Sequence, residues 1–281
     1  MGLYNQRNVF EDGSEIISIP EGVKRIGRDF EYDDHLTMVR MPNSVVEIED
    51  SAFKFCNKLH SVELSNSLRV IGQYAFCGCS SLTSIRLPES LTSVGESAFS
   101  GCSGLTHLRI PKRVKEIGLK AFDGTSLKEI LVDEGNPFYY SSNNCLIESK
   151  TNGLIAGCSG VPIIIPYGVK CIFQGAFHDI SSIFIPDSII HVSSSGLPWR
   201  KITKFYLGYQ DPGKAYDAVF KRYLELFDFS DYEEQAIQNN TQLFVPYGIA
   251  RVYSQHHFFS KFKGIIEHSG LSGSPITLSF F

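Results

Sequence analysis

The side chains best suited to chemistry in this chain are its seven cysteines, which could bind a metal or form disulfides. The closest pair, Cys77-Gly-Cys79, lacks both the C-x-x-C spacing of zinc sites and histidines at zinc spacing. Cys56, Cys79 and Cys102 instead follow one another at a constant step of 23 residues. A repeated position of this kind predicts buried thiols, because free cysteine acts in a core as a small apolar residue. The residues leave open whether a disulfide forms among the three later cysteines, Cys145, Cys158 and Cys171.

Other reactive side chains form no catalytic or metal-binding motif. The sequence contains no G-x-S-x-G, no phosphate-binding loop and no H-E-x-x-H. The adjacent His256 and His257 would point about 100° apart on a helix, which makes a poor pair of metal ligands. An acidic cluster lacks the alternating Asp/Asn pattern and turn glycine of a calcium loop; it consists of Glu225, Asp228, Asp231, Glu233 and Glu234. The sequence therefore predicts no enzyme, no metal site and no cofactor.

The cysteine step belongs to a block of about 23 residues that repeats along the chain. An Ala-Phe pair, an aliphatic residue and a leucine keep the same step, at Ala52-Phe53, Ala75-Phe76, Ala98-Phe99 and Ala121-Phe122, at Ile48, Ile71, Val94 and Ile117, and at Leu36, Leu59, Leu82 and Leu105. Prolines mark further blocks at Pro20, Pro42, Pro88, Pro111, Pro166 and Pro186. This period predicts a solenoid, because one coil cannot bury its apolar face alone and stacked coils bury it jointly.

Residues 82–104 illustrate how one coil is expected to fold. Alternation at period two puts Ile85 and Leu87 on one side of a short strand over residues 82–87. Pro88 ends that strand, because proline cannot donate to a strand ladder. A second extended piece follows at residues 91–95, and residues 96–99 predict a helical turn that places Phe99 in the core. Strands of successive coils should pair in parallel, about 4.8 Å apart.

The repeated block, written LTSIRLPESLTSVGESAFSGCSG at residues 82–104, resembles the BspA-like leucine-rich repeat family over about residues 9–207. Residues 136–158 and 243–267 are similar to an irregular coil and a closing module of the same family. The resemblance implies a leucine-rich repeat solenoid, with a parallel β-sheet, short helical turns in each coil and a C-terminal α/β capping segment. The expected division is an N-terminal cap at 1–15, a solenoid at 16–207 with an irregular coil at 132–160, and a capping module at 208–281.

For function, the resemblance implies a secreted or cell-surface protein of anaerobic host-associated bacteria that acts in adhesion or binding. Its partner would be a host or bacterial surface protein or a glycan. Two alternatives stay open from the residues: an intracellular scaffold or spacer without a dedicated ligand, and an enzyme with a site near residues 208–281, which no motif supports. No leader is visible after Met1, so we expect either an exported chain whose leader is not included or a cytoplasmic one.

A binding surface is expected on the strands, where one residue of each coil points outwards between two inward apolar residues. That column reads Arg40, Glu63, Arg86, Arg109 and Leu131. Arg86 and Arg109 should lie one strand spacing apart without an acidic partner, which suits them to bind carboxylate or sulfate groups. The alternative is that these charges only keep the sheet soluble. A second extended column offers another face, at Lys24, Arg69, Thr92 and Lys115.

Composition narrows the partners further. The net charge of −4 gives no basic excess to neutralise phosphates, so nucleic acid is not an expected partner. The most apolar stretch, residues 161–166, is far shorter than the roughly 20 residues that span a bilayer. Near the C-terminus, Asp211-Pro212 predicts a helix start, and apolar residues from Tyr216 to Phe227 recur at helical spacing. We expect this helix to cover the solenoid end of a monomer, with partner docking as the alternative.

Overall fold

The computed structural model describes residues 7–9, 13, 15–159, 163–193, 195–199, 201–221, 240–262 and 264–268. The chain divides into two compact units, each of which is described by itself. The N-terminal unit comprises Met1–Ser159 and Phe173–His178, and the C-terminal unit comprises Gly160–Ile172 and Asp179–Phe281. Both are parallel solenoids with few helices, as the repeat predicts.

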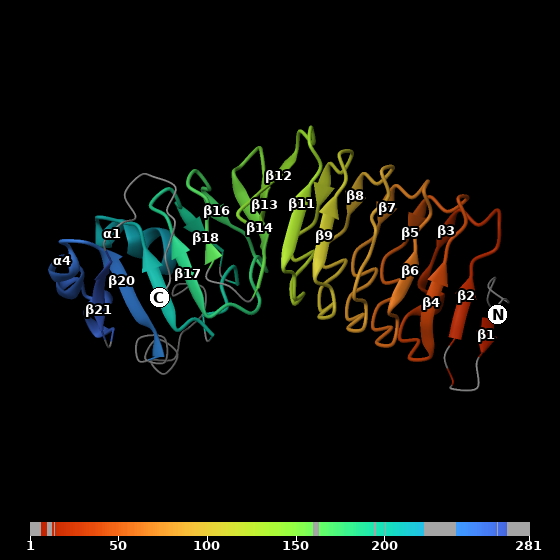
Figure 1. The fold of residues 1–281 in the computed structure, drawn as a ribbon, viewed down its shortest axis with the longest axis horizontal. Helices are drawn as coiled ribbons and strands as arrows, with labels where there is room; N and C mark the ends of the chain where they lie inside the picture. The colour runs from red at the N-terminus through yellow and green to blue at the C-terminus, as the bar shows by residue number, and fades with distance from the viewer. Residues whose placement is uncertain are drawn as a thin grey trace. The chain divides into compact units, whose positions relative to one another are not determined.

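The N-terminal unit carries one strand of a first parallel column in most of its coils (Figure 1). These strands are β2 (Glu15–Ser18), β4 (Leu36–Arg40), β6 (Ser61–Glu63), β9 (His107–Ile110) and β11 (Glu129–Val132). Their register places Arg40 opposite Glu63 and Arg109 opposite Leu131, so corresponding positions of successive coils lie side by side. At the start of the chain, β1 (Arg7–Val9) pairs antiparallel with β2.

A second column of two-residue strands forms a separate five-stranded sheet. Its members are β3 (Arg25–Ile26), β5 (Glu47–Ile48), β7 (Val70–Ile71), β8 (Ser93–Val94) and β10 (Glu116–Ile117). All of them pair in parallel, with Ile48 opposite Ile71 and Ile71 opposite Val94. The aliphatic position of the repeat thus becomes a row of inward side chains.

The strand predicted at residues 82–87 is wrong in its hydrogen bonding, because the chain there belongs to no strand and the first column is interrupted between β6 and β9. The predicted alternation is nevertheless present: Ile85 and Leu87 are buried, whereas Arg86 is exposed. Burial needs only that alternate side chains face the core, and it does not require a ladder hydrogen bond at every coil.

The helical turn predicted at residues 96–99 is also wrong. Ser97 has a left-handed backbone with φ 53°, and equivalent turns have Ser51 at 61° and Tyr74 at 56°. This geometry sends alternate amides to the next coil: Ser97 N donates to Leu119 O and Phe99 N donates to Ala121 O, at 3.0 and 2.8 Å. A helix would keep these bonds within one coil, whereas the observed turn ties adjacent coils together. Among the described coils of the N-terminal unit, the first alone has a helical turn, the 3-10 helix η1 (Arg28–Phe30).

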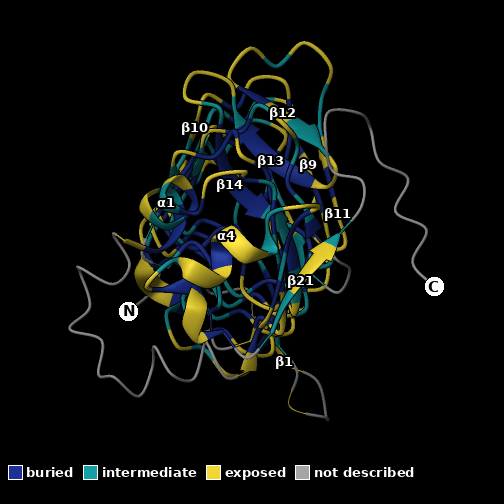
Figure 2. Ribbon diagram, turned by 90° about the vertical axis from the view of Figure 1, so that its left-hand side faces the viewer, coloured by how far each residue is buried: buried dark blue, intermediate teal, exposed yellow. Residues whose placement is uncertain are grey.

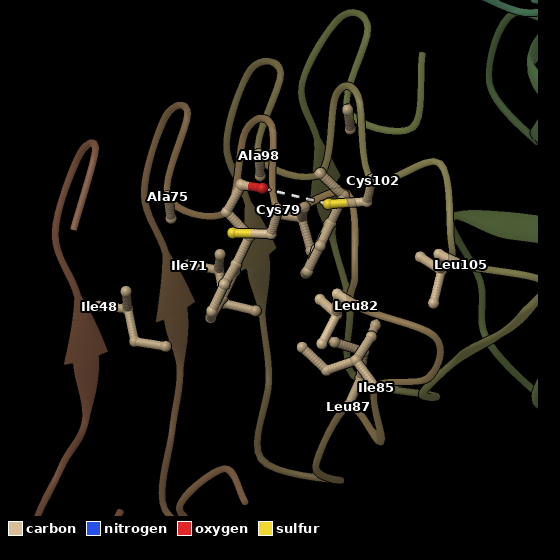
Figure 3. Close-up of a cluster of buried hydrophobic side chains, with 14 of the residues drawn as sticks. Ile48, Ile71, Ala75, Cys79, Leu82, Ile85, Leu87, Ala98, Cys102 and Leu105 are labelled. Atoms are coloured by element: carbon tan, nitrogen blue, oxygen red, sulfur yellow. Dashed lines mark hydrogen bonds between the residues drawn. The ribbon is translucent and has the colours of Figure 1, made fainter. Parts of the chain in front are cut away.

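The core of the N-terminal unit consists of repeated side chains stacked coil upon coil (Figure 3). Five phenylalanine rings form a continuous stack with centroids 5.2 to 5.8 Å apart and interplanar angles of 4° to 8°: Phe30, Phe53, Phe76, Phe99 and Phe122. The expected irregular coil contains an antiparallel meander of β12 (Tyr139–Ser142), β13 (Cys145–Glu148) and β14 (Gly153–Gly157).

The C-terminal unit continues the architecture with a five-stranded parallel sheet. In sheet order its strands are β15 (Ile163–Ile164), β17 (Ser182–Ile185), β19 (Lys204–Leu207), β20 (Gln242–Pro246) and β21 (Ile265–His268). A shorter parallel pair consists of β16 (Cys171–Ile172) and β18 (His191–Val192). The middle residues of β21 are exposed to solvent (Figure 2).

Short helices complete the C-terminal unit. As predicted, Asp211 caps α1 (Pro212–Ala215), because its carboxylate accepts hydrogen bonds from the amides of Gly213 and Lys214. The chain then continues as a π-helix, η2 (Tyr216–Lys221), followed after β20 by α4 (Ala250–Gln255) and the 3-10 helix η3 (Phe259–Lys261). The rest of the predicted apolar helix face, the acidic cluster at 225–234 and most of residues 1–14 lie outside the described residues.

Candidate ligand-binding face

The predicted outward column is exposed on the N-terminal unit. Arg40, Glu63, Arg86 and Arg109 are all exposed, and Leu131 at the end of the column is 50% exposed. Strand pairing aligns Arg40 with Glu63 across β4 and β6, and Arg109 with Leu131 across β9 and β11. Arg86 lies in no strand and holds the same place in the repeat between these two pairs. The structure therefore brings these side chains onto one face, which we call the charged column.

Ion pairs correct the expectation that Arg109 lacks an acidic partner. Its guanidinium donates to Glu89 Oε1 at 2.8 Å and to Asp133 Oδ2 at 2.7 Å. The hydrogen bond with Glu89 is the largest cause of an upward shift in the pKa of Arg109. Arg40 is paired as well, with 3.3 Å between its Nε and Glu63 Oε1. Two arginines of the charged column are thus already bound to carboxylates of the protein itself.

Arg86 differs from its neighbours in the charged column. It is exposed, and no carboxylate pairs with its guanidinium within the part of the chain that the structure describes. A guanidinium presents five N–H donors in a planar fork that matches carboxylate, phosphate and sulfate oxygens. Arg86 therefore retains its full capacity for an anionic group from solution, whereas Arg40 and Arg109 would have to exchange partners.

The second extended column is also accessible to solvent. Lys24, Arg69 and Lys115 are exposed, and Thr92 is half-buried with its hydroxyl donating to the carbonyl oxygen of Arg69 at 3.0 Å. The backbone amide of Thr92 donates to the carbonyl oxygen of Arg69, and that of Lys115 donates to Thr92. These bonds place Arg69, Thr92 and Lys115 on consecutive coils. This column is therefore a physically separate cationic row.

The cysteine column is chemically protected. Cys56, Cys79 and Cys102 are fully buried free thiols, as predicted. Burial raises the pKa of Cys56 to about 12 and raises those of Cys79 and Cys102 well above the ordinary thiol value. A protonated, inaccessible thiol is a poor nucleophile and a poor metal ligand. Cys145, Cys158 and Cys171 are also free thiols, so the structure forms no disulfide among them.

The paired histidines sit in an aromatic environment. The rings of His256 and His257 lie 4.4 Å apart, and both contact Tyr216, at 5.5 and 5.1 Å between centroids. Burial lowers the pKa of His256, which favours its neutral form. Across the described ranges, no group of three metal-ligating side chains comes together, and no helix has the length and apolar character needed to cross a bilayer.

Comparison with known proteins decides the kind of repeat. The pattern described as "BspA type Leucine rich repeat region" matches residues 24–152 in six copies. The repeat region belongs to the BspA-type leucine-rich repeat family. None of the curated proteins compared with the chain matches it.

Solved leucine-rich repeat proteins share the fold of this chain. One from Eubacterium ventriosum is 18% identical with a TM-score of 0.52, and the match covers 71% of this chain and 63% of that one. One from Bacteroides ovatus is 17% identical with a TM-score of 0.50, covering 95% of this chain and 76% of that one. The chain thus spans less than two thirds of the length of the Eubacterium ventriosum protein.

The outward position of the repeat continues beyond Leu131, where the charged column ends. The C-terminal unit has the same position at Ile164, Phe184, Tyr206, Phe244 and Ile266, which the register of β15, β17, β19, β20 and β21 aligns. Three of these residues lie two places before a proline, as Arg40, Arg86 and Arg109 do, so proline spacing was the signal that could have found them. Here the outward position is apolar rather than charged.

Proposed function

We propose that this chain is a non-enzymatic binding protein of the bacterial surface, which contacts a host or bacterial surface protein or glycan through the charged column. The observation that carries the proposal is Arg86, an exposed guanidinium without a carboxylate partner among the described residues, set between Glu63 and Arg109 in the column. A stacked core below the column holds such side chains at fixed spacing, and repeat proteins use extended faces of this kind for binding.

The surface location is supported by the family of the repeat region, and the non-enzymatic role by the protected cysteine column. The match at residues 24–152 identifies a BspA-type repeat, whose resemblance implies surface proteins. The buried thiols have their pKa values raised by desolvation, which disfavours nucleophilic catalysis.

Binding of the folded protein to heparin and to immobilised host-matrix proteins tests this proposal. Arg86→Ala should weaken binding by about tenfold, since a hydrogen bond to a charged group contributes about that much affinity. Arg86→Lys should restore part of it, because the charge returns without the planar fork. Arg113→Ala is the matched control, since Arg113 is an exposed arginine of the same unit outside the charged column. Unchanged binding by folded Arg86→Ala and Arg86→Ala/Arg109→Ala variants would exclude the charged column and direct the search to Arg69 and Lys115.

A second candidate is a scaffold or spacer without a dedicated ligand. It is favoured by the ion pairs within the column, since Arg40 and Arg109 already satisfy carboxylates of the same chain. Surface pairs of this kind contribute solubility and little stability. This candidate would be supported if the wild-type protein bound none of the matrix proteins or glycans while remaining monomeric and folded.

A further inference from the structure

The outer face of the C-terminal sheet carries a continuous row of apolar side chains. Register places Ile164 beside Phe184, Phe184 beside Tyr206, Tyr206 beside Phe244 and Phe244 beside Ile266; we call these five residues the apolar row. Ile266 is 41% exposed, and the other four are half-buried. Outward residues of a sheet that faces water are usually polar, so a row of five apolar side chains indicates contact with something other than water.

Aromatic stacking gives the centre of the apolar row a defined shape. The rings of Tyr206 and Phe244 stack with centroids 4.3 Å apart and an interplanar angle of 14°. Tyr206 therefore covers one face of Phe244, and the opposite face is turned towards β21. On β21 it is Ile266 that lies beside Phe244. Gly264 comes just before β21, one place before the Leu243–Ile265 pair, and a Cβ there would meet no atom within 4 Å. Open space therefore lies at the start of β21, next to the apolar row.

That open space belongs to a groove of about 430 Å³ at the start of β19, β20 and β21. It is lined by Thr203, Lys204, Asn240, Gln242, Gly264 and Ile266. The side chains of Lys204, Asn240 and Gln242 have no hydrogen-bond partner among the described residues. The groove therefore combines two free amides and one free ammonium with an apolar border at Ile266.

Charge at the groove favours an anionic ligand. Among the described residues of the lining, Lys204 is the one charged side chain. The nearest acidic residue on β21, Glu267, is turned the other way, where its Oε1 accepts a hydrogen bond from the amide of Ala250 at 2.9 Å. His268, the next outward residue on β21, has its pKa lowered by burial, so it is neutral near pH 7. A carboxylate entering the groove would meet a cation and no nearby carboxylate from these residues.

We propose that the groove and the apolar row bind an acidic oligosaccharide, that is, a sugar chain carrying carboxylates. Primary amides can donate and accept at once, which suits adjacent sugar hydroxyls, and Lys204 supplies the partner for the carboxylate. The C–H faces of the sugar rings would pack against Phe244 and Ile266. This inference rests on the proposed function of a binding protein, to which it adds a ligand class and a second site on the C-terminal unit.

Titration calorimetry with the full chain tests the site directly. Sialyllactose and a hyaluronan hexasaccharide are the acidic probes, which separate sialic acid from uronic acid as the carboxylate source, and lactose is the neutral control. We expect lactose to bind at least about tenfold more weakly than one of the acidic probes, because it cannot pair with Lys204. Lys204→Met should reduce acidic binding to the lactose level, and Gln242→Glu should abolish it through charge repulsion. Lys170→Met, an exposed lysine of the same unit outside the groove, should bind like the wild type.

Distinct results would overturn the inference. Binding that is unchanged by Lys204→Met and by Gln242→Glu in folded variants would exclude this groove, and absence of binding to both acidic probes would exclude the ligand class. Sedimentation that shows a wild-type dimer lost on Tyr206→Ala or Phe244→Ala would mean that a second copy of the chain covers the apolar row. Loss of heparin or matrix binding in Arg86→Ala, but not in Lys204→Met, would leave the proposed function standing while this site fails.

Discussion

The thiol of Cys79 donates a hydrogen bond of 3.1 Å to the backbone carbonyl oxygen of Phe53 in the preceding coil. The same bond recurs one coil on, from Cys102 to Phe76 at 3.1 Å, and one coil back, from Cys56 to Phe30 at 2.9 Å. The cysteine column is therefore more than apolar filling, because each thiol also links two coils at the turn that carries the stacked phenylalanine. Figure 3 shows the bond that Cys102 donates. Both roles require a reduced, protonated sulfur.

We predict that Cys56, Cys79 and Cys102 stay unreactive towards a thiol reagent at pH 8 in the folded protein and react once it is denatured. Complete burial blocks access, and the raised pKa values keep the thiolate fraction low. Cys77, which is partly exposed, provides the internal comparison and should react first. Mass spectrometry that finds a disulfide between any two of the three buried residues would contradict this assignment.

Stability should fall as the solution becomes alkaline. Burial raises the pKa of Cys56 and of Cys145 to about 12 from an ordinary thiol value of 9.0, so the unfolded chain releases protons that the folded protein keeps. The stability from these thiols is fully present below about pH 9 and is lost progressively as pH rises towards 12. Urea midpoints measured between pH 8 and 11 should decrease, less steeply in Cys56→Ser. A flat profile would show that the thiols are not desolvated.

Phe99→Ala should lower the free energy of unfolding by about 3–5 kcal/mol, as other large-to-small core substitutions do. Phe99 is fully buried and stacks on both Phe76 and Phe122, at 5.4 and 5.8 Å. Phe138→Ala is the matched control, because Phe138 is 40% exposed, and it should cost less than about 1 kcal/mol. Similar denaturation midpoints for the two variants would mean that the phenylalanine stack does not stabilise the core.

Periodicity predicted the solenoid, the phenylalanine stack and the buried thiols because each depends on a residue type recurring at one position of the coil. It could not predict the ion pairs of Arg109, whose partners Glu89 and Asp133 lie 20 and 24 residues away rather than at the 23-residue step. Such contacts depend on where long side chains reach after the coils are stacked. Likewise, the left-handed turn at Ser97 satisfies amides of the neighbouring coil, a requirement that one block read alone does not reveal.

Phe55→Gly should be more stable than Phe55→Ala by about 1 kcal/mol, because only glycine adopts a left-handed backbone without strain. Phe55 has φ 58°, and its ring stacks on Tyr32 at 5.3 Å. Both substitutions lose this stacking, so their difference isolates the backbone. Gly101 occupies the same turn position with φ 74° and has room for a Cβ, so Gly101→Ala should cost about 1 kcal/mol for the same reason. Equal stability of the two Phe55 variants would argue against strain at this turn.

Tyr253 should anchor α4 to the C-terminal sheet region. It is fully buried, and its hydroxyl donates to the carbonyl oxygen of Tyr209 at 2.9 Å, while the Tyr209 hydroxyl donates in turn to Ile189. Tyr253→Phe keeps the ring and removes the donor, so we expect a loss of about 1 kcal/mol.

The measurement for Tyr253→Phe can be confined to the C-terminal unit. Trp199 is the sole tryptophan of the sequence, and its ring stacks on Phe205 at 5.7 Å, so its fluorescence reports unfolding there. Tyr247→Phe removes a hydroxyl from a side chain that is 76% exposed and should leave the midpoint unchanged. A loss in Tyr253→Phe alone would show that α4 folds as part of this unit, because the deleted bond joins α4 to residue 209. Equal midpoints for both variants would mean that α4 is only loosely attached.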